Sequence, residues 1–382
     1  MAVAQGYGKI VTSGSVFAYD VGDTRNSFRG EPAVNLVPNA DTMANWGSYS
    51  AGNDGTFITE FGTTGYRVRN KNTWNGIARG ITLPTPGTYT ISAWFRIWGK
   101  SSGNNGINVY TSGGGISDTA QGGDDTRIGE WQRISMTRTY TTTSFTFYII
   151  SWGGTSGVDW SSWDVTKPQV ELKSHVTPFI AGTRSATQGL LDLTGNNTID
   201  LSNVSFDSNA QMTFDGTNDY VSIPQSTGVN ITTNTITFGG WCYPTVSNKY
   251  QHLVVKNVGE ARQYGMWLSV NGTSQIFRNV NGVVTQTNVT ISTPWAVNAW
   301  NYIMLVYNGS TIKIYLNGSE VWSENASGNI VTTSSNVNIG GEPTQPYFFN
   351  GQIAVAQVYN RALTAAEVNQ NYRHYKTRFN LS

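Results

Sequence analysis

Apolar and polar residues alternate along most of the chain, which predicts β-strands, and the pattern is clearest near the C-terminal end. Residues 353–359 have the apolar density and the period of two that a strand with both faces covered needs. Thr364 and Glu367 then have the spacing of a capping box, in which two side chains bond to free backbone amides at a helix start. We therefore predict a strand-rich fold that closes with one short C-terminal helix.

The same strand pattern occurs twice, which predicts two domains. Residues 88–99 place apolar side chains on one face and Trp94, Arg96 and Trp98 on the other. Residues 235–243 repeat this pattern, again with a Trp inside the strand. Hairpins are predicted where Asn-Gly pairs separate alternating runs, because both turn residues need positive φ. These pairs lie at 271–272, 281–282, 308–309 and 317–318.

We predict an all-β protein with two tandem antiparallel β-sandwich (jelly-roll) domains, residues 33–185 and 186–382. Residues 1–32 precede them as a short N-terminal arm, because isolated aromatic residues among glycines cannot form a separate core. Two interpretations of this arm stay open. It is either a flexible tail or a segment that becomes ordered only against a partner, since such segments can wrap a surface.

Composition and charge narrow the class of protein. Charged residues make up 12% of the chain, about half the usual share, while Gly (42) and Trp (13) are abundant. A net charge of +1 without a run of Lys or Arg predicts no nucleic-acid partner. No segment approaches about 18 consecutive apolar residues, so we predict no membrane insertion. The first residues lack a signal-peptide pattern, and Cys242 has no partner cysteine, so we expect folding in a cytosol.

Several segments of the second domain resemble the laminin-G-like, concanavalin A-like lectin/glucanase jelly roll, in the order of that family. They are residues 212–224, 236–244, 299–318, 337–341 and 349–372. The first domain resembles the jelly rolls of carbohydrate-binding modules. Its opening at 35–39 and its ending at 168–171 and 177–180 are similar to those of phage virion proteins.

An arm, such a module and a laminin-G-like domain together resemble phage tail-fibre, adhesin or head-decoration proteins. The resemblance implies synthesis in the host cytoplasm and a final location on the virion. It also implies that the arm docks to other virion proteins while the jelly rolls face outward. Sheet edges and loops favour a homo-oligomer in such proteins.

Catalysis by the family's usual route is not expected. The retaining glycanases of this family carry a Glu-x-Asp-x-x-Glu strand whose carboxylates lie about 5 Å apart, and the sequence has no such stretch. Its histidines have neither metal-site nor triad spacing. The prediction is therefore a protein that is not an enzyme.

Sugar binding needs aromatic faces for the apolar side of a pyranose ring and polar groups for its hydroxyls. The candidate residues are Trp98, Arg96, Trp94, Trp74, Tyr347 and Phe348. Further tryptophans are considered, namely Trp152, Trp160, Trp163 and Trp241. The competing interpretation is that tryptophans inside strands pack in the cores of the sandwiches.

Calcium is a possible ligand that we do not predict. Asp215, Asn218 and Asp219, or Asp124 and Asp125, have suitable oxygen atoms. Turn formation explains both clusters equally well. Related modules often carry a calcium-binding Asp on the strand that here carries Gln169 and Glu171. We therefore predict no metal and no other cofactor.

The function predicted from the sequence is that of a phage virion structural protein whose lectin-like domains attach to host surface polysaccharide. Two alternatives remain. One is a purely structural decoration or fibre component without sugar binding, and the other is a hydrolase of envelope or capsular glycan.

Overall fold

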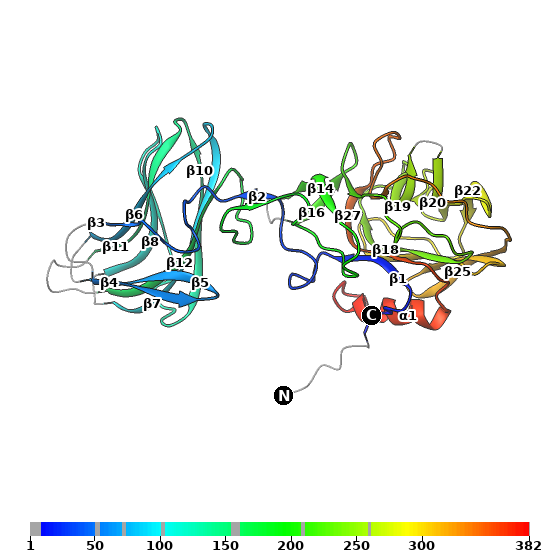
Figure 1. Ribbon diagram of the computed structural model, residues 1–382, viewed down its shortest axis with the longest axis horizontal. Helices are drawn as coiled ribbons and strands as arrows, with labels where there is room; N and C mark the ends of the chain where they lie inside the picture. Colours follow the sequence, from blue (N-terminus) through cyan, green and yellow to red (C-terminus); the bar gives the residue numbers. More distant parts are fainter. Residues whose placement is uncertain are drawn as a thin grey trace. The chain divides into compact units, whose positions relative to one another are not determined.

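The computed structural model describes residues 9–49, 54–70, 74–100, 104–153, 161–207, 211–258 and 261–381. These residues form two compact units (Figure 1). The inserted unit lies within Ala33–Ser185. The main unit combines described residues 9–32, 186–207 and 211–381. The chain therefore starts in the main unit, leaves it after Pro32 and returns to it at Ala186.

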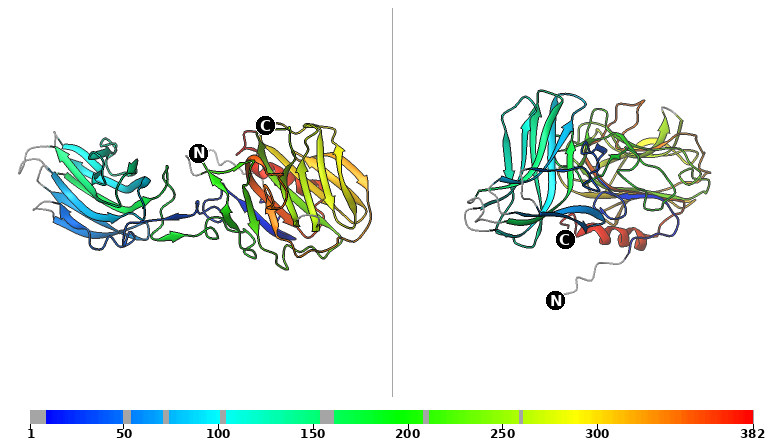
Figure 2. Two further views of the ribbon diagram at one scale, coloured as in Figure 1. Left: turned by 90° about the horizontal axis from the view of Figure 1, so that it is seen from above. Right: turned by 60° about the vertical axis from the view of Figure 1, so that its left-hand side comes forward.

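The described residues of the inserted unit form a sandwich of two antiparallel sheets (Figure 2). The first sheet has the order β10 (Trp131–Tyr140), β7 (Gly87–Lys100), β12 (Ser161–Glu171), β5 (Thr63–Asn70), β4 (Asp54–Glu60). The second has the order β3 (Gly47–Tyr49), β6 (Trp74–Thr82), β11 (Ser144–Gly153), β8 (Asn104–Gly113), β9 (Thr119–Gly122). Phe95 and Trp163 from the first sheet share one core with Phe147 from the second. A short pair, β2 (Ala33–Val34) with β13 (Thr183–Arg184), joins the two ends of the unit.

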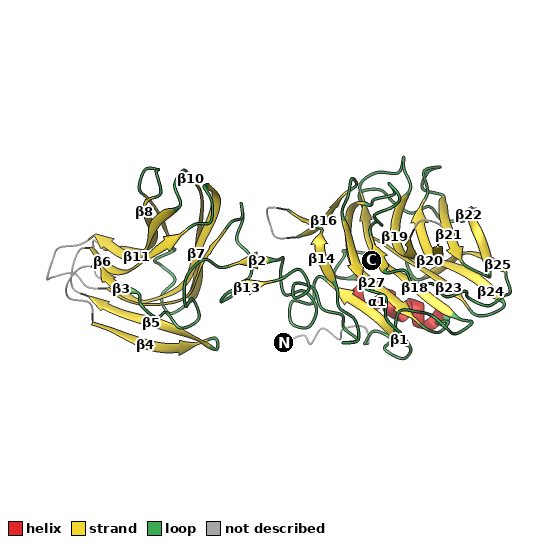
Figure 3. Cartoon of the chain, turned by 45° about the horizontal axis from the view of Figure 1, so that its top comes forward, coloured by secondary structure: helices red, strands yellow, loops and turns green. Residues whose placement is uncertain are grey.

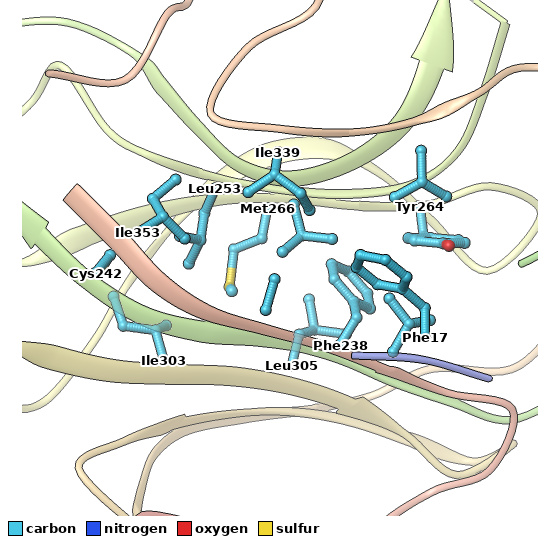
Figure 4. Packing of buried hydrophobic residues seen from close by; sticks show 14 of the residues in the cluster. Phe17, Phe238, Cys242, Leu253, Tyr264, Met266, Ile303, Leu305, Ile339 and Ile353 are labelled. Carbon is cyan, nitrogen blue, oxygen red and sulfur yellow. The ribbon is translucent and has the colours of Figure 1, made fainter. Parts of the chain in front are cut away.

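The described residues of the main unit also form two antiparallel sheets (Figure 3). The larger has the order β15 (Ser205–Phe206), β16 (Met212–Asp215), β27 (Asn350–Tyr359), β18 (Ile236–Pro244), β23 (Asn301–Tyr307), β24 (Thr311–Leu316), β25 (Ser319–Asn325). The other has the order β14 (Asp200–Asn203), β17 (Tyr220–Ile223), β26 (Val337–Ile339), β19 (Gln251–Val258), β20 (Ala261–Leu268), β21 (Gln275–Val280), β22 (Val284–Thr290). Side chains such as Phe238, Met266 and Leu305 fill the space between the sheets (Figure 4).

One strand of the main unit comes from the predicted N-terminal arm. β1 (Ser15–Asp20) pairs antiparallel with β27. Phe17 and Tyr19 of β1 have no exposed surface and belong to the main core. Residues 15–20 therefore lack a core of their own, as the sequence indicated, but they complete a core formed by residues far away in the sequence.

The helix α1 (Ala365–Lys376) packs against the outer face of the larger sheet (Figure 3). Thr364 and Glu367 make both hydrogen bonds of the capping box, which confirms that prediction. Within the part of the chain that the structure describes, α1 is the single helix, and no helix is long and apolar enough to span a membrane. The prediction of an all-β fold of antiparallel sandwiches with one short C-terminal helix is confirmed.

Candidate binding face

The outer face of β7 carries three side chains that the strand pattern placed together. The side chains at 93, 95 and 97 lie in the core of the inserted unit. Trp94, Arg96 and Trp98 lie on the opposite face of the sheet, where Trp94 and Arg96 are half-buried and Trp98 is 44% exposed. This face is the candidate site, because it presents aromatic rings beside charged groups at the protein surface.

Asp164 of β12 is the centre of the polar contacts on this face. Its cross-strand partners are Arg96 on β7 and Arg67 on β5. Arg67 Nε donates to Asp164 Oδ1 at 2.6 Å, Arg96 Nη2 donates to Oδ2 at 2.9 Å, and Trp98 Nε1 donates to Oδ2 at 2.7 Å. Burial acts to raise the pKa of Asp164, but these hydrogen bonds outweigh it and hold the pKa below its ordinary value. Asp164 is therefore an anion that fixes three neighbouring side chains.

A β-bulge sets the direction of Trp98. Ile97 pairs with Trp163 and Gly99 pairs with Ser162, so Trp98 has no cross-strand partner on β12. Such a bulge bends the strand and re-aims the side chain of the extra residue. The guanidinium carbon of Arg96 lies 4.3 Å from the centroid of the Trp98 ring, and that of Arg67 lies 5.4 Å away. Trp98 is thus exposed to solvent but held in one position by its neighbours.

Aromatic and cationic side chains follow one another across this face as a continuous row, here named the aromatic–cation row. Its members, in order, are Trp98, Arg96, Trp131, Phe61, Lys167 and Phe179. Arg96 lies 4.6 Å from the Trp131 ring centroid, and the Trp131 and Phe61 ring centroids are 5.3 Å apart. Lys167 Nζ lies 4.8 Å from the Phe61 centroid and 5.8 Å from that of Phe179. These distances are in the range of cation–π and aromatic contacts.

Two members of the row have unusual backbone conformations. Phe61 (φ 53°) and Gly62 (φ 72°) form the two-residue turn between β4 and β5, where both positions need positive φ. A large side chain is uncommon at such a position, and here it places a ring that is 56% exposed beside Trp131. Lys167 (φ 53°) and Pro168 form a bulge in β12. Strained conformations of this kind persist only where the surrounding structure fixes them, and they recur at functional sites.

The other end of the same sheet face is covered by the segment that follows β12. Glu171 accepts hydrogen bonds from the Thr177 amide at 2.9 Å and from its hydroxyl at 2.6 Å. Gln169 Nε2 donates to the Thr177 hydroxyl at 3.0 Å. Asn35 donates to the carbonyl groups of Pro168 and Ile180, so it ties the opening of the unit to its ending. These hydrogen bonds join the opening of the inserted unit to its ending, and the Glu171 carboxylate is already bonded to Thr177.

Four of the predicted sugar-binding residues are not members of the row. Trp94 lies beside it, with its ring centroid 6.4 Å from that of Phe61. Trp74 begins β6 in the second sheet of the inserted unit, and its side chain lies outside the described residues. Tyr347 packs against Tyr250 and His252 in the main unit. Phe348 is only 9% exposed and lines a pocket of about 430 Å³ with Asp219 and Tyr220.

The other tryptophans divide between packed and undescribed positions. Trp163 and Trp241 have no exposed surface, and Trp241 is covered by the ring of Phe379 at 4.4 Å. The packing interpretation therefore holds for these two side chains. The side chain of Trp152 and the whole of Trp160 lie outside the described residues.

The acidic clusters considered for calcium form turns in the structure. Asp124 Oδ1 accepts hydrogen bonds from the Thr126 amide and hydroxyl, and these bonds lower the Asp124 pKa. Asp215 accepts from the amides of Thr217 and Asn218. Asp219 accepts from the Asp215 amide and the Ser205 hydroxyl. The described residues contain no group of three or more His, Cys, Asp or Glu side chains placed to hold a metal ion.

Sequence reasoning missed several members of the site. They are Glu60, Phe61, Arg67, Trp131, Asp164 and Lys167. The available signal was the period of two around Asp164, which puts a carboxylate on the face opposite the core residues Trp163 and Val165. No comparable pattern indicated that β5 and β7 lie beside β12, because the order of strands in a sheet depends on residues that are far apart in the sequence.

Part of the chain matches a known family model. Residues 215–369 match the family model described as the concanavalin A-like lectin/glucanases superfamily. No curated protein matches the sequence. The predicted similarity of the second domain to this superfamily is therefore confirmed over these residues.

Three solved structures are similar to the chain at low identity. The binding domain of Paraclostridial Mosquitocidal Protein 1 is 16% identical, with a TM-score of 0.38, and the match covers 49% of each chain. Trypanosoma rangeli sialidase is 14% identical, with a TM-score of 0.39, over 62% of this chain and 43% of that one. TmCBM61 in complex with β-1,4-galactotriose is 13% identical, with a TM-score of 0.29, over 36% of this chain and 99% of that one. The chain thus spans about half the length of the first structure.

Proposed function

We propose that the protein is a non-enzymatic binding protein and that the aromatic–cation row is its saccharide-binding face. The observation that carries this proposal is the exposed Trp98 ring, which Asp164 and Arg96 hold in place. An aromatic ring can stack on the apolar face of a pyranose, while adjacent charged groups form hydrogen bonds with its hydroxyls. The row supplies both kinds of contact on one face.

The fixed geometry of the row favours binding. Immobilising a mobile side chain on binding costs about 0.5–1.5 kcal/mol. Trp98 and Arg96 are already held by hydrogen bonds to Asp164, and a hydrogen bond of 2.6 Å joins Arg96 to Glu60. The side chains of Trp98 and Arg96 are therefore already ordered before a saccharide binds, so binding does not have to immobilise them.

Binding without hydrolysis fits the state of the carboxylates on this face. A general acid must hold a proton near the working pH, whereas Asp164 is buried and its pKa is lowered by its hydrogen bonds. Glu60 is an ion-pair partner of Arg96. Release of reducing sugar from a glycan that is lost in Asp164→Asn or Glu60→Gln would instead support the hydrolase alternative.

The test is saccharide binding by the full chain and by the variant Trp98→Ala, displayed in many copies on beads and applied to a glycan array. The matched control is Phe57→Ala, because Phe57 is 62% exposed in the same unit and contacts Tyr66 rather than the row. We expect Trp98→Ala to weaken binding by about tenfold or more and the control to leave it unchanged. No binding at millimolar sugar, or equal binding by wild type and Trp98→Ala, would contradict the proposal.

We further propose that the protein is a component of a bacteriophage virion, as a tail fibre, adhesin or head-decoration protein that attaches to host surface polysaccharide. The support is the resemblance stated for residues 35–39, 168–171 and 177–180. Many copies in a homo-oligomer would raise the avidity of individually weak sites. Arg25 and Arg29 are exposed in the N-terminal segment and are candidate contacts to other virion proteins. Absence of the protein from purified particles, tested by antibody labelling, would overturn this location.

A purely structural role is the second candidate. It is favoured by the packing of Trp163 and Trp241, which serve the cores. In that case the row would be a contact surface between proteins of the particle. Particles that carry Trp98→Ala would then lose the protein during assembly, whereas under the binding proposal they would keep it and attach poorly to cells.

A further inference from the structure

The charges on the aromatic–cation row do not balance. Arg67, Arg96, Arg133 and Lys167 bring four cations to this face, and Asp164, Glu60 and Glu171 bring three carboxylates. Each carboxylate has an arginine as its counter-charge. Asp164 pairs with Arg67 and Arg96, Glu60 pairs with Arg96 at 2.6 Å, and the charge of Glu171 acts on the nearby Arg133. One positive charge is therefore left over.

That charge belongs to Lys167. Its Nζ lies over the rings of Phe61 and Phe179, and within the described ranges no carboxylate lies within 4.0 Å of it. Partial burial, together with the nearby charge of Arg133, lowers the pKa of Lys167. The protein thus holds this ammonium group where it is less well solvated than a surface lysine, without supplying an anion.

Resting on the proposed function, we propose that the row selects saccharides that carry a negative charge and that Lys167 binds the acidic group. A carboxylate, sulfate or phosphate on the sugar would form a charge-assisted hydrogen bond with Nζ, which is stronger than a bond to a neutral hydroxyl. The exposed Phe61 ring lies beside the ammonium and offers an apolar surface for the sugar ring.

A bulge in the backbone of β12 fixes the position of Lys167. Lys167 and Pro168 form the bulge of β12, and the ring of Pro168 fixes its own φ. The cation is therefore placed by the backbone next to the row, and its aromatic neighbours limit the directions that its side chain can take. A site organised in this way can discriminate an acidic sugar from a neutral one of the same shape.

The experiment compares matched saccharides on the full-length protein displayed in many copies. Polygalacturonate is compared with its carboxyl-reduced, neutral form, and dextran sulfate is compared with dextran, so the two pairs distinguish a carboxylate from a sulfate. The variants are Lys167→Gln, Lys167→Arg and Trp98→Ala. The control Lys313→Gln removes a surface charge, paired with Glu320, from the main unit. Circular dichroism melting establishes that each variant is folded.

We expect the wild type and Lys313→Gln to bind at least one acidic form about tenfold or more tightly than its neutral counterpart. Lys167→Gln should lose this preference and Lys167→Arg should keep it. Equal binding of acidic and neutral forms by the wild type, or a preference that survives Lys167→Gln, would overturn the inference. If neutral forms bind and Trp98→Ala abolishes that binding, the saccharide-binding function stands and only the charge selectivity fails. If no form shows binding that depends on Trp98, both fail.

Discussion

The indole Nε1 of Trp98 donates a hydrogen bond of 2.7 Å to the carboxylate of Asp164, a residue with no exposed surface. The same carboxylate accepts from Arg67 and Arg96. One buried anion thus orders an exposed ring and two guanidinium groups. The order of the aromatic–cation row and the stability of the inserted unit therefore depend on the same residue.

Asp164→Asn is expected to lower the free energy of unfolding of the inserted unit by about 2–4 kcal/mol, because it leaves two arginines without their shared anion. Urea denaturation of the full chain measures this change. The control is Glu130→Gln, which removes an exposed ion pair with Arg127 and should cost less than about 0.5 kcal/mol. Equal effects of the two substitutions would show that Asp164 does not organise the face.

Phe17→Ala is expected to destabilise the main unit by about 3–5 kcal/mol, since it leaves a cavity in a packed core. Phe17 has no exposed surface and lies in β1, which pairs with β27. Differential scanning calorimetry of the full chain measures the effect. Phe57→Ala, at a side chain that is 62% exposed, should leave the melting of the main unit unchanged. If Phe17→Ala also left it unchanged, β1 would not be part of that core in solution.

Local patterns in the sequence are enough to predict several of the strands and the helix, but not β1 (Ser15–Asp20), which lies in the predicted arm. The period of two in β7 placed Trp94, Arg96 and Trp98 on one face, and the spacing of Thr364 and Glu367 predicted the capping box. These features depend on residues that are neighbours in the chain. Their physical cause therefore lies in a short stretch of sequence.

Pairings between distant strands could not be predicted in this way. The order β7-β12-β5 brings Arg67 and Arg96 to Asp164, and β1 pairs with a strand near the other end of the chain. Burial of Phe348 has a similar origin. Its ring packs over Gly341, where an added Cβ would lie 2.4 Å from Phe348 Cδ1. The loop with Tyr347 and Phe348, which the sequence suggested for sugar stacking, is thus partly buried.

Acid is expected to weaken the main unit through Glu367. The hydrogen bond from Arg361, with others from Thr364, lowers the pKa of Glu367 to about 2 in the folded protein, below the value of about 4.3 in an unfolded chain. The unfolded chain therefore takes up this proton first. The stabilisation is present above about pH 4.3 and is lost as the pH falls toward 2.

Urea unfolding at pH 7, 4 and 2.5 tests this prediction by comparing the wild type with Glu367→Gln. At pH 7 the variant should be less stable by roughly 1 kcal/mol, because it loses the charge in the ion pair with Arg361 and at the helix cap. The difference should shrink at pH 2.5. A difference that stays constant with pH would show that Glu367 does not titrate in this range.

Thr177→Val is expected to destabilise the inserted unit without weakening saccharide binding by the aromatic–cation row. Thr177 is buried, and its hydroxyl donates to Glu171 and accepts from Gln169. Valine has a similar shape but leaves these two buried polar groups without that partner, which costs about 1–3 kcal/mol. The control Thr42→Val, at an exposed threonine of the same unit, should change stability by less than about 0.5 kcal/mol. Below its melting temperature, Thr177→Val should bind saccharide as the wild type does, because the row keeps Trp98 and Arg96 and their hydrogen bonds to Asp164. Loss of binding in the folded variant would instead show that the hydrogen bonds of Thr177 with Glu171 and Gln169 are needed for binding.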